Sequence, residues 1–82
     1  MPVSVSPSKK LNLRERVYQM LRERIQMGQI GLGDRLVDHD IAHKLHVSRM
    51  PVREALMQLK SEGTLEGTAR GFVLRRHSLQ QI

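Results

Sequence analysis

Apolar residues recur at helical spacing in three segments of the chain. Residues 13–27 carry an apolar side chain at every fourth position, and residues 51–62 repeat them at i, i+3, i+4 and i+7. A shorter segment, residues 38–45, has the same character. This pattern predicts three amphipathic helices that bury their apolar stripes against one another. The stripe positions, in chain order, are Leu13, Val17, Leu21, Ile25, Ile41, Ala42, Leu45, Val52, Ala55, Leu56 and Leu59.

The residues at the helix starts support these boundaries. Asn12 followed by Glu15 has the spacing of a capping box, in which the two side chains satisfy free backbone amides. Pro51 fits the first turn of a helix, where its missing N–H is not needed. Two caps are compatible with this helix. Ser48 as the cap would place Pro51 at the third helical position, and Met50 would place it at the first.

Short strand-like runs complete the pattern. A glycine-containing turn over residues 29–34 leads into residues 35–37, which favour a very short strand. After the third helix, residues 64–66 and 72–75 favour two strands. The turn between them contains Gly67, Arg70 and Gly71. This order of elements predicts a mainly α fold with a small β hairpin: a winged helix-turn-helix, in which three helices form the core and the hairpin is the wing.

Composition narrows the class of protein. The chain has 82 residues, enough for one small domain, and its 39% hydrophobic and 27% charged residues are typical of a globular one. Residues 1–10 lack the hydrophobic segment of a signal peptide and are predicted to be a flexible lead-in. No apolar run approaches the roughly 20 residues that span a bilayer. With no cysteine, disulfides, thiolate metal sites and cysteine nucleophiles are excluded.

Charge favours a binding function over catalysis. Fourteen Lys and Arg residues against eight Asp and Glu give a net charge of +6, which attracts nucleic acid, anionic membranes or acidic proteins. His39 and His43 have the spacing of metal ligands, but Asp38 and Asp40 point around the predicted helix away from a shared focus. Glu54 has no acidic partner for acid–base catalysis. We therefore predict that the chain is not an enzyme and has no metal or cofactor.

Basic residues gather on two predicted elements. Arg49, Arg53 and Lys60 fall on one side of the third helix, beside its apolar stripe. An arginine-bearing helix that follows another helix and a tight turn is typical of helices that enter the DNA major groove. The predicted hairpin carries Arg70 in its turn, where it can reach a minor groove or a row of phosphates. Three alternatives stay open: a solvated basic surface, a protein-interaction module that binds an acidic partner, and a membrane-surface role for the first helix.

Longer motifs then point to a family. The sequence V-S-R-x-P-V-R-E-A-L is followed by L-x-x-E-G, and Arg70-Gly71 comes seven residues after that glycine. Upstream, V-Y-x-x-L-R-x-x-I-x-x-G-x-I-x-x-G-x-x-L extends the pattern toward the N-terminus. Residues 13–75 thus resemble the winged-helix DNA-binding domain of GntR-type bacterial transcriptional regulators. The L-V-D-H-D-I-A segment before the second helix, together with P-V-R-E-A-L, is most similar to the FadR/FCD branch.

The resemblance implies a one-component regulator whose DNA-binding domain spans residues 11–76. In such proteins a larger C-terminal domain binds a small-molecule effector, and residues 77–82 resemble the start of the linker to that domain, which is absent from this chain. The family implies a cytoplasmic bacterial protein, usually a homodimer, that binds inverted-repeat operators in double-stranded DNA. A metabolite-responsive repressor is the expected function.

The resemblance also assigns roles to individual positions. It implies that Arg49 and Arg53 read bases and that Arg70 and Gly71 form the wing tip. Three positions depart from the family pattern. His39 stands where an arginine commonly touches DNA, Met50 replaces a small hydroxyl residue, and Leu32 replaces a proline. The full set of expected DNA-binding residues is His39, Ser48, Arg49, Met50, Pro51, Arg53, Arg70 and Gly71, with Ser48 and the Met50–Pro51 amide region near phosphate.

Overall fold

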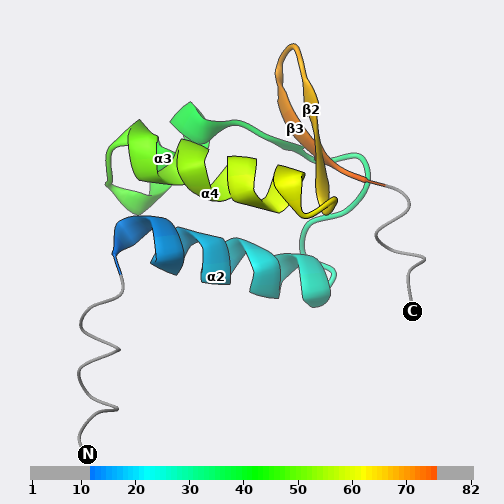
Figure 1. Ribbon diagram of the computed structural model, residues 1–82, viewed down its shortest axis with the longest axis horizontal. Helices are drawn as coiled ribbons and strands as arrows, with labels where there is room; N and C mark the ends of the chain where they lie inside the picture. Colours follow the sequence, from blue (N-terminus) through cyan, green and yellow to red (C-terminus); the bar gives the residue numbers. More distant parts are fainter. Residues whose placement is uncertain (1–11, 76–82) are drawn as a thin grey trace, which may run out of the picture.

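The computed structural model describes residues 12–75, so the predicted lead-in (residues 1–10) and linker (residues 77–82) lie outside the described residues. In the described part, three helices and three strands follow the predicted order (Figure 1). They form the winged helix-turn-helix that the pattern predicted. The elements are α2 (Leu13–Gln26), β1 (Arg35–Leu36), α3 (Asp38–Leu45), α4 (Arg49–Ser61), β2 (Leu65–Thr68) and β3 (Gly71–Leu74).

Helix α2 begins with the predicted capping box. The Glu15 backbone N–H donates to Oδ1 of Asn12 at 2.8 Å, and the Asn12 backbone N–H donates to Oε1 of Glu15 at 3.2 Å. These bonds matter because the first amides of a helix have no partner within it. The helix ends at Gln26, one residue before the predicted end, and Gly28 follows with the left-handed φ of +79° that commonly ends helices.

Helix α4 begins at Arg49, two residues before the predicted start at Pro51. Ser48 is the N-cap residue, so the alternative with Met50 as the cap is wrong. Pro51 is the third helical residue, and a proline is tolerated there because the N–H groups of the first turn have no acceptor within the helix. The Ser48 side chain makes no capping hydrogen bond. Ser48 therefore acts as the N-cap through its extended backbone conformation and not through a side-chain hydrogen bond.

The turn between α3 and α4 is short. His46 has a left-handed φ of 59° and is the only non-glycine residue with a positive φ among residues 12–75. The Val47 N–H donates to the Ala42 carbonyl oxygen at 3.0 Å, which draws the chain back across the end of α3. This tight return sets the two helices at the angle of a helix-turn-helix.

Helix α4 is the centre of the core. Its stripe residues Val52, Ala55, Leu56 and Leu59 are all 0% exposed, and α4 packs against α2, α3 and β2. In the stripe of α2, Val17 and Leu21 are buried and Ile25 is half-buried, whereas Leu13 at the helix start is 42% exposed. The other buried residues are Val17, Tyr18, Leu21, Ile30, Leu36, Ala42, Leu65 and Leu74.

A polar contact joins α2 to the end of α4. The Tyr18 hydroxyl donates to the Glu62 carboxylate, whose two oxygens both lie at 2.8 Å, and Arg22 Nη1 donates to the same hydroxyl at 3.4 Å. Burial raises the pKa of Tyr18, and the Glu62 carboxylate raises it further, whereas Arg22 acts in the opposite direction. The neutral phenol is therefore the form that the folded domain favours.

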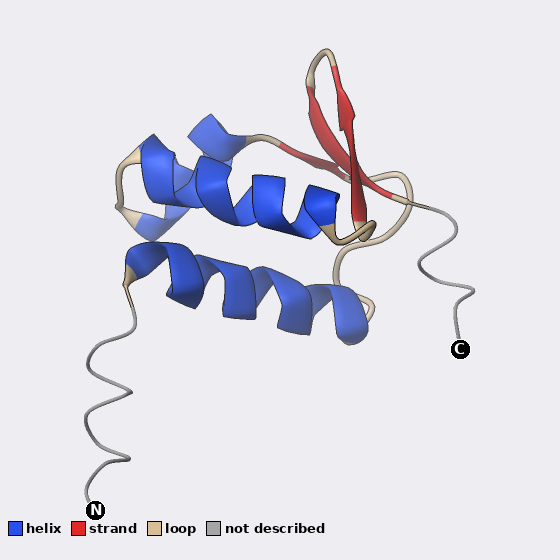
Figure 2. Ribbon diagram, in the orientation of Figure 1, coloured by secondary structure: helices blue, strands red, loops and turns tan. Residues whose placement is uncertain are grey.

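The three strands form one antiparallel sheet in the order β1-β3-β2 (Figure 2). The sheet is a feature that the pattern did not predict, since only the hairpin was expected. Strand β2 extends beyond the predicted 64–66 to include Gly67 and Thr68, and β3 begins one residue earlier than predicted, at Gly71. The hairpin loop is thus only Ala69 and Arg70. It projects from the C-terminal end of α4, away from α2 (Figure 1).

Gly71 permits the close approach of β3 to β1. Its φ is +140°, and a Cβ atom at this position would lie 2.6 Å from the Leu36 carbonyl oxygen. Real Cβ atoms do not approach a backbone oxygen so closely, and L-residues rarely adopt this φ. A glycine is therefore required where the wing strand joins the short strand before α3.

Candidate nucleic-acid interface

The solvent-facing side of α4 carries basic residues. Because the stripe of α4 faces the core, Arg49, Arg53 and Lys60 lie on its exposed side, as the spacing predicted. Arg49 and Arg53 are one helical turn apart near the start of the helix. One wall of a candidate site is thus a helix whose opening turns present two guanidinium groups.

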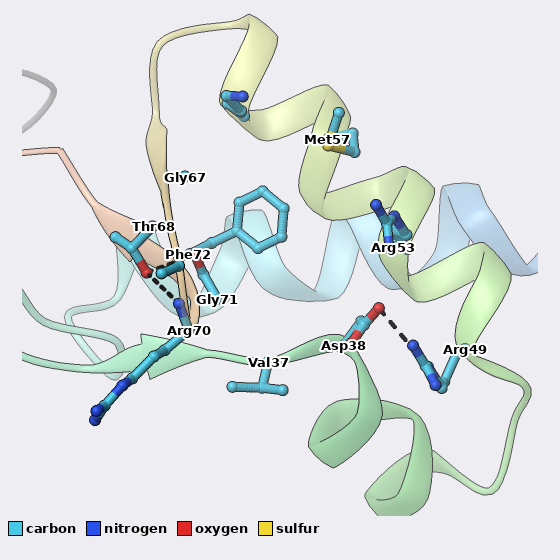
Figure 3. A pocket seen from close by; sticks show the side chains of 12 residues that line it. Val37, Asp38, Arg49, Arg53, Met57, Gly67, Thr68, Arg70, Gly71 and Phe72 are labelled. Atoms are coloured by element: carbon cyan, nitrogen blue, oxygen red, sulfur yellow. Dashed lines mark hydrogen bonds and ion pairs between the residues drawn. The ribbon is translucent and has the colours of Figure 1, made fainter.

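The hairpin forms the opposite wall. Thr68 Oγ1 donates to the Gly71 carbonyl oxygen at 2.9 Å and accepts from the Arg70 backbone N–H at 3.2 Å, which closes the loop. The Arg70 side chain is exposed and extends away from α4 in Figure 3. Phe72, from β3, lies between the strands and α4 in the same view. The loop thus fixes the backbone of Arg70 and leaves its guanidinium free to move in solvent.

An open groove of about 700 Å³ lies between these walls. Among the described residues that line it, Asp38 is the only acid. The groove therefore combines a strongly positive surface with an open shape, an arrangement that attracts an extended polyanion. The basic residues that line it are Arg49, Arg53, Lys60 and Arg70.

The Lys60 side chain passes over Gly67 on its way to the groove. A Cβ atom on Gly67 would lie 3.5 Å from both Cε and Nζ of Lys60, an ordinary van der Waals distance, so the lysine stem runs directly over strand β2. Gly67, predicted to lie in the turn, thus shapes the groove from within the strand.

Asp38 pairs with Arg49 across the groove mouth. Nε of Arg49 lies 3.8 Å from Oδ2 of Asp38 (Figure 3). Oδ1 of Asp38 accepts from the His39 backbone N–H at 2.6 Å. The Asp38 side chain is 16% exposed and that of Arg49 is 61% exposed. Such a pair contributes little stability because the arginine is well solvated. Asp38 instead holds the Arg49 guanidinium near the start of α3.

The structure brings together only some of the predicted site residues. Arg49, Arg53, Arg70 and Gly71 line the groove. Met50 lies beside it, in a recess shared with Asp38 and the two α4 arginines. His39 lies in a separate recess on α3 with Asp40, His43 and Lys44. Ser48 and Pro51 lie at the start of α4 but do not line the groove.

Eight groove residues were not among the predicted site residues: Val37, Asp38, Met57, Lys60, Gly67, Thr68, Ala69 and Phe72. The Asp38–Arg49 contact joins two helices and has no spacing signal in the chain. Thr68 could have been recognised, because a threonine that precedes a two-residue loop commonly bonds its backbone. Phe72 was assigned to a strand, but the direction of its side chain depends on the pairing of β2 with β3, which was not predicted.

Among residues 12–75, no group of three or more His, Asp or Glu side chains could hold a metal ion. No helix in this part of the chain is both long and apolar enough to cross a membrane.

The fold and the site together define the class of this domain. It is a winged helix-turn-helix with a basic groove between its third helix and its wing. The family model described as bacterial regulatory proteins, gntR family, matches residues 13–73. The chain belongs to this family.

Curated relatives agree with this assignment. The chain is 39% identical over 77 residues to uncharacterized HTH-type transcriptional regulators from two Mycobacterium tuberculosis strains, CDC 1551 and H37Rv. The match covers 90% of this chain and 32% of each relative. The chain therefore spans about a third of the length of these relatives.

A solved structure shares the fold. Lar, which controls the expression of the Listeria monocytogenes agr system and mediates virulence, superimposes with a TM-score of 0.70 at 30% sequence identity. The match covers 79% of this chain and 31% of that one. The described residues thus correspond to part of a longer protein in this case as well.

Proposed function

We propose that this chain binds double-stranded DNA sequence-specifically, as the DNA-binding part of a GntR-type transcriptional regulator. The observation that carries the proposal is that one open groove is lined by Arg49 and Arg53 from α4 and by Arg70 from the hairpin. In the proposed complex, α4 lies in the major groove and the hairpin lies at the minor groove or the sugar–phosphate backbone.

The two walls have different roles in this proposal. Arg49 and Arg53 come from the opening turns of α4, the part of a recognition helix that contacts base edges. An arginine there can bond O6 and N7 of guanine with both arms of its guanidinium group. Arg70, on a narrow exposed loop, is placed to contact phosphates, which position the protein without reading sequence.

Finer features of the regulator are proposed from the family resemblance. The L-V-D-H-D-I-A segment at the start of α3 favours the FadR/FCD branch. The regulator would be a homodimeric, cytoplasmic repressor that binds an inverted repeat and responds to a metabolite through a second domain. The relatives' lengths support a second domain, because the matched region is only about a third of each of them.

Selection of duplexes from a random pool tests the proposal. The 82-residue chain would be bound to the pool, and the enriched duplex would then be titrated beside a scrambled duplex of equal composition. We expect a shared half-site to be enriched and the scrambled duplex to bind much more weakly. Equal affinity for both duplexes would contradict sequence-specific binding.

An acidic protein partner is the competing explanation for the same arginines. The two explanations are separated by adding polyglutamate, at matched charge concentration, to the titrations with the enriched and the scrambled duplex. DNA recognition predicts that the duplex is retained at polyglutamate concentrations that displace the scrambled duplex. If polyglutamate removes both duplexes equally, the basic groove is an unselective polyanion site.

A further inference from the structure

Two methionines lie on the exposed side of α4. Met50 is 62% exposed and Met57 is 43% exposed, whereas the helix buries all four residues of its apolar stripe. An exposed methionine side chain presents an apolar surface, which gains no favourable free energy from lying near a phosphate group. The arginines and Lys60 explain an attraction to DNA, but they do not explain these two thioethers.

The position of Met50 around the axis of α4 determines which part of a DNA groove its side chain would face. At about 100° per residue, Met50 and Met57 both fall within about 30° of the direction opposite the centre of the buried stripe. Arg49 and Arg53 lie to one side, toward the hairpin. A helix that enters a groove with its exposed side first therefore brings its methionines to the groove floor, with the arginines on the flank that faces the wing.

Position along the helix separates the two methionines. Met50 is the second residue of α4 and shares a recess of about 270 Å³ with Asp38, Arg49 and Arg53. Met57 lies two turns further on and lines the larger groove beneath the hairpin. Because residues near the start of a recognition helix contact base edges, Met50 is the one placed to meet the floor.

The floor of the major groove offers one apolar group, the C5 methyl of thymine. A thioether on a flexible side chain can adapt to that methyl but cannot form the strong hydrogen bonds that read other base edges. Resting on the proposed DNA binding, we propose that Met50 is a specificity-determining residue that reads a thymine methyl beside the bases contacted by Arg49 and Arg53. The predicted half-site contains a thymine at that position.

A uracil scan tests this contact. Each thymine of the enriched duplex is replaced, one at a time, by deoxyuridine, which removes the methyl and keeps the base pair. Affinities are measured by fluorescence anisotropy with the 82-residue chain. At one position per half-site, we expect affinity to fall about fourfold, the factor for one methyl group left in water. At the other thymines we expect little change.

Variants connect the effect to the side chain. Met50→Ala and Met50→Gln should each bind the thymine and uracil duplexes equally at the sensitive position, since neither variant offers an apolar side chain that reaches the methyl. Met27→Ala is the matched control: Met27 is 66% exposed at the end of α2, away from the groove. That control should keep the fourfold difference. Circular dichroism of each variant verifies that it is folded.

Other outcomes overturn the inference. If no thymine is sensitive, or if the sensitivity persists in Met50→Ala, Met50 does not read a methyl, although sequence-specific binding by the arginines would stand. If the random pool yields no enriched sequence at all, the proposed function fails and this contact fails with it. The two failures are thus distinguished by the selection step.

Discussion

Helix α4 and the β2–β3 hairpin face the same groove but are held in place differently. Four side chains of α4 are 0% exposed and pack against both other helices. The hairpin buries only Leu65 and Leu74, at its base, and every residue from Glu66 to Arg70 is exposed. The outer part of the hairpin therefore depends on backbone pairing, on the Thr68 hydrogen bonds, on Gly71 and on the partly buried Phe72. Opening of α4 should therefore require the full free energy of unfolding of the domain, whereas the outer hairpin can open locally at a lower free energy.

Removing a core side chain should affect both walls and have the largest effect. Leu56→Ala deletes part of a side chain that is 0% exposed, at the centre of the packing of α4. We expect the free energy of unfolding to fall by about 2–5 kcal/mol, a large share of the stability of so small a domain. Urea unfolding followed by circular dichroism measures this. A loss below about 1 kcal/mol would show that α4 is not the centre of the core.

A substitution at Gly71 should damage the hairpin wall alone. Gly71→Ala places a Cβ atom 2.6 Å from the Leu36 carbonyl oxygen, at a φ of +140° that an alanine rarely adopts. We expect a loss of about 1–3 kcal/mol. Hydrogen exchange should accelerate at the amides of β2 and β3 much more than at those of residues 52–59.

The matched control is Gly33→Ala, where nothing lies within 4 Å of the added Cβ atom and φ is not positive. This variant should leave exchange in the hairpin unchanged. Equal acceleration in both variants would mean that the close approach to Leu36 is not what holds the sheet together.

Replacing the loop arginine should have a smaller effect that does not depend on DNA sequence. Arg70→Ala removes an exposed side chain whose loop is closed by Thr68 and not by the guanidinium. We expect affinity to fall to a similar extent for enriched and scrambled duplexes, and the slope of log affinity against log salt to decrease in magnitude by about 1. Titrations at several salt concentrations measure both. An unchanged slope would argue against a phosphate contact.

The smallest expected effect concerns the contact that joins α2 to α4. The folded domain raises the pKa of Tyr18 above its usual value of 10.0, so it binds a proton that the unfolded chain loses more readily. This contribution is complete below pH 10 and is lost as pH rises through the folded pKa. Urea unfolding should therefore show stability declining above pH 10, with a smaller decline in Tyr18→Phe. Identical pH profiles would contradict a role for the phenol.

The helices could be predicted because their signals are local. The capping box of Asn12 and the four-residue stripe of α4 are patterns of neighbouring residues, and both are confirmed. The start of α4 was predicted two residues late because Pro51 is compatible with either of two positions in a first turn. Tertiary packing, which places Ser48 after the tight turn at His46, decides between them.

The groove could be predicted only in part. The α4 arginines follow from helical periodicity, and the wing arginine from the turn signal. The pairing of β1 with β3, the Asp38–Arg49 contact and the passage of Lys60 over Gly67 join residues distant in sequence, and such contacts leave no periodic pattern. Met50 lies opposite the buried positions of α4. Its direction could therefore have been predicted from the apolar stripe if the start of the helix had been assigned correctly.

The most direct test of base reading by α4 compares Arg53→Ala on two duplexes. Affinity for the enriched duplex and for a random duplex is measured at one fixed salt concentration, with Arg70→Ala as the matched loss of one positive charge. If Arg53 reads bases, Arg53→Ala costs about 1–3 kcal/mol on the enriched duplex and much less on the random one, whereas Arg70→Ala affects both alike. Equal losses on the two duplexes for Arg53→Ala would contradict the claim that α4 reads sequence.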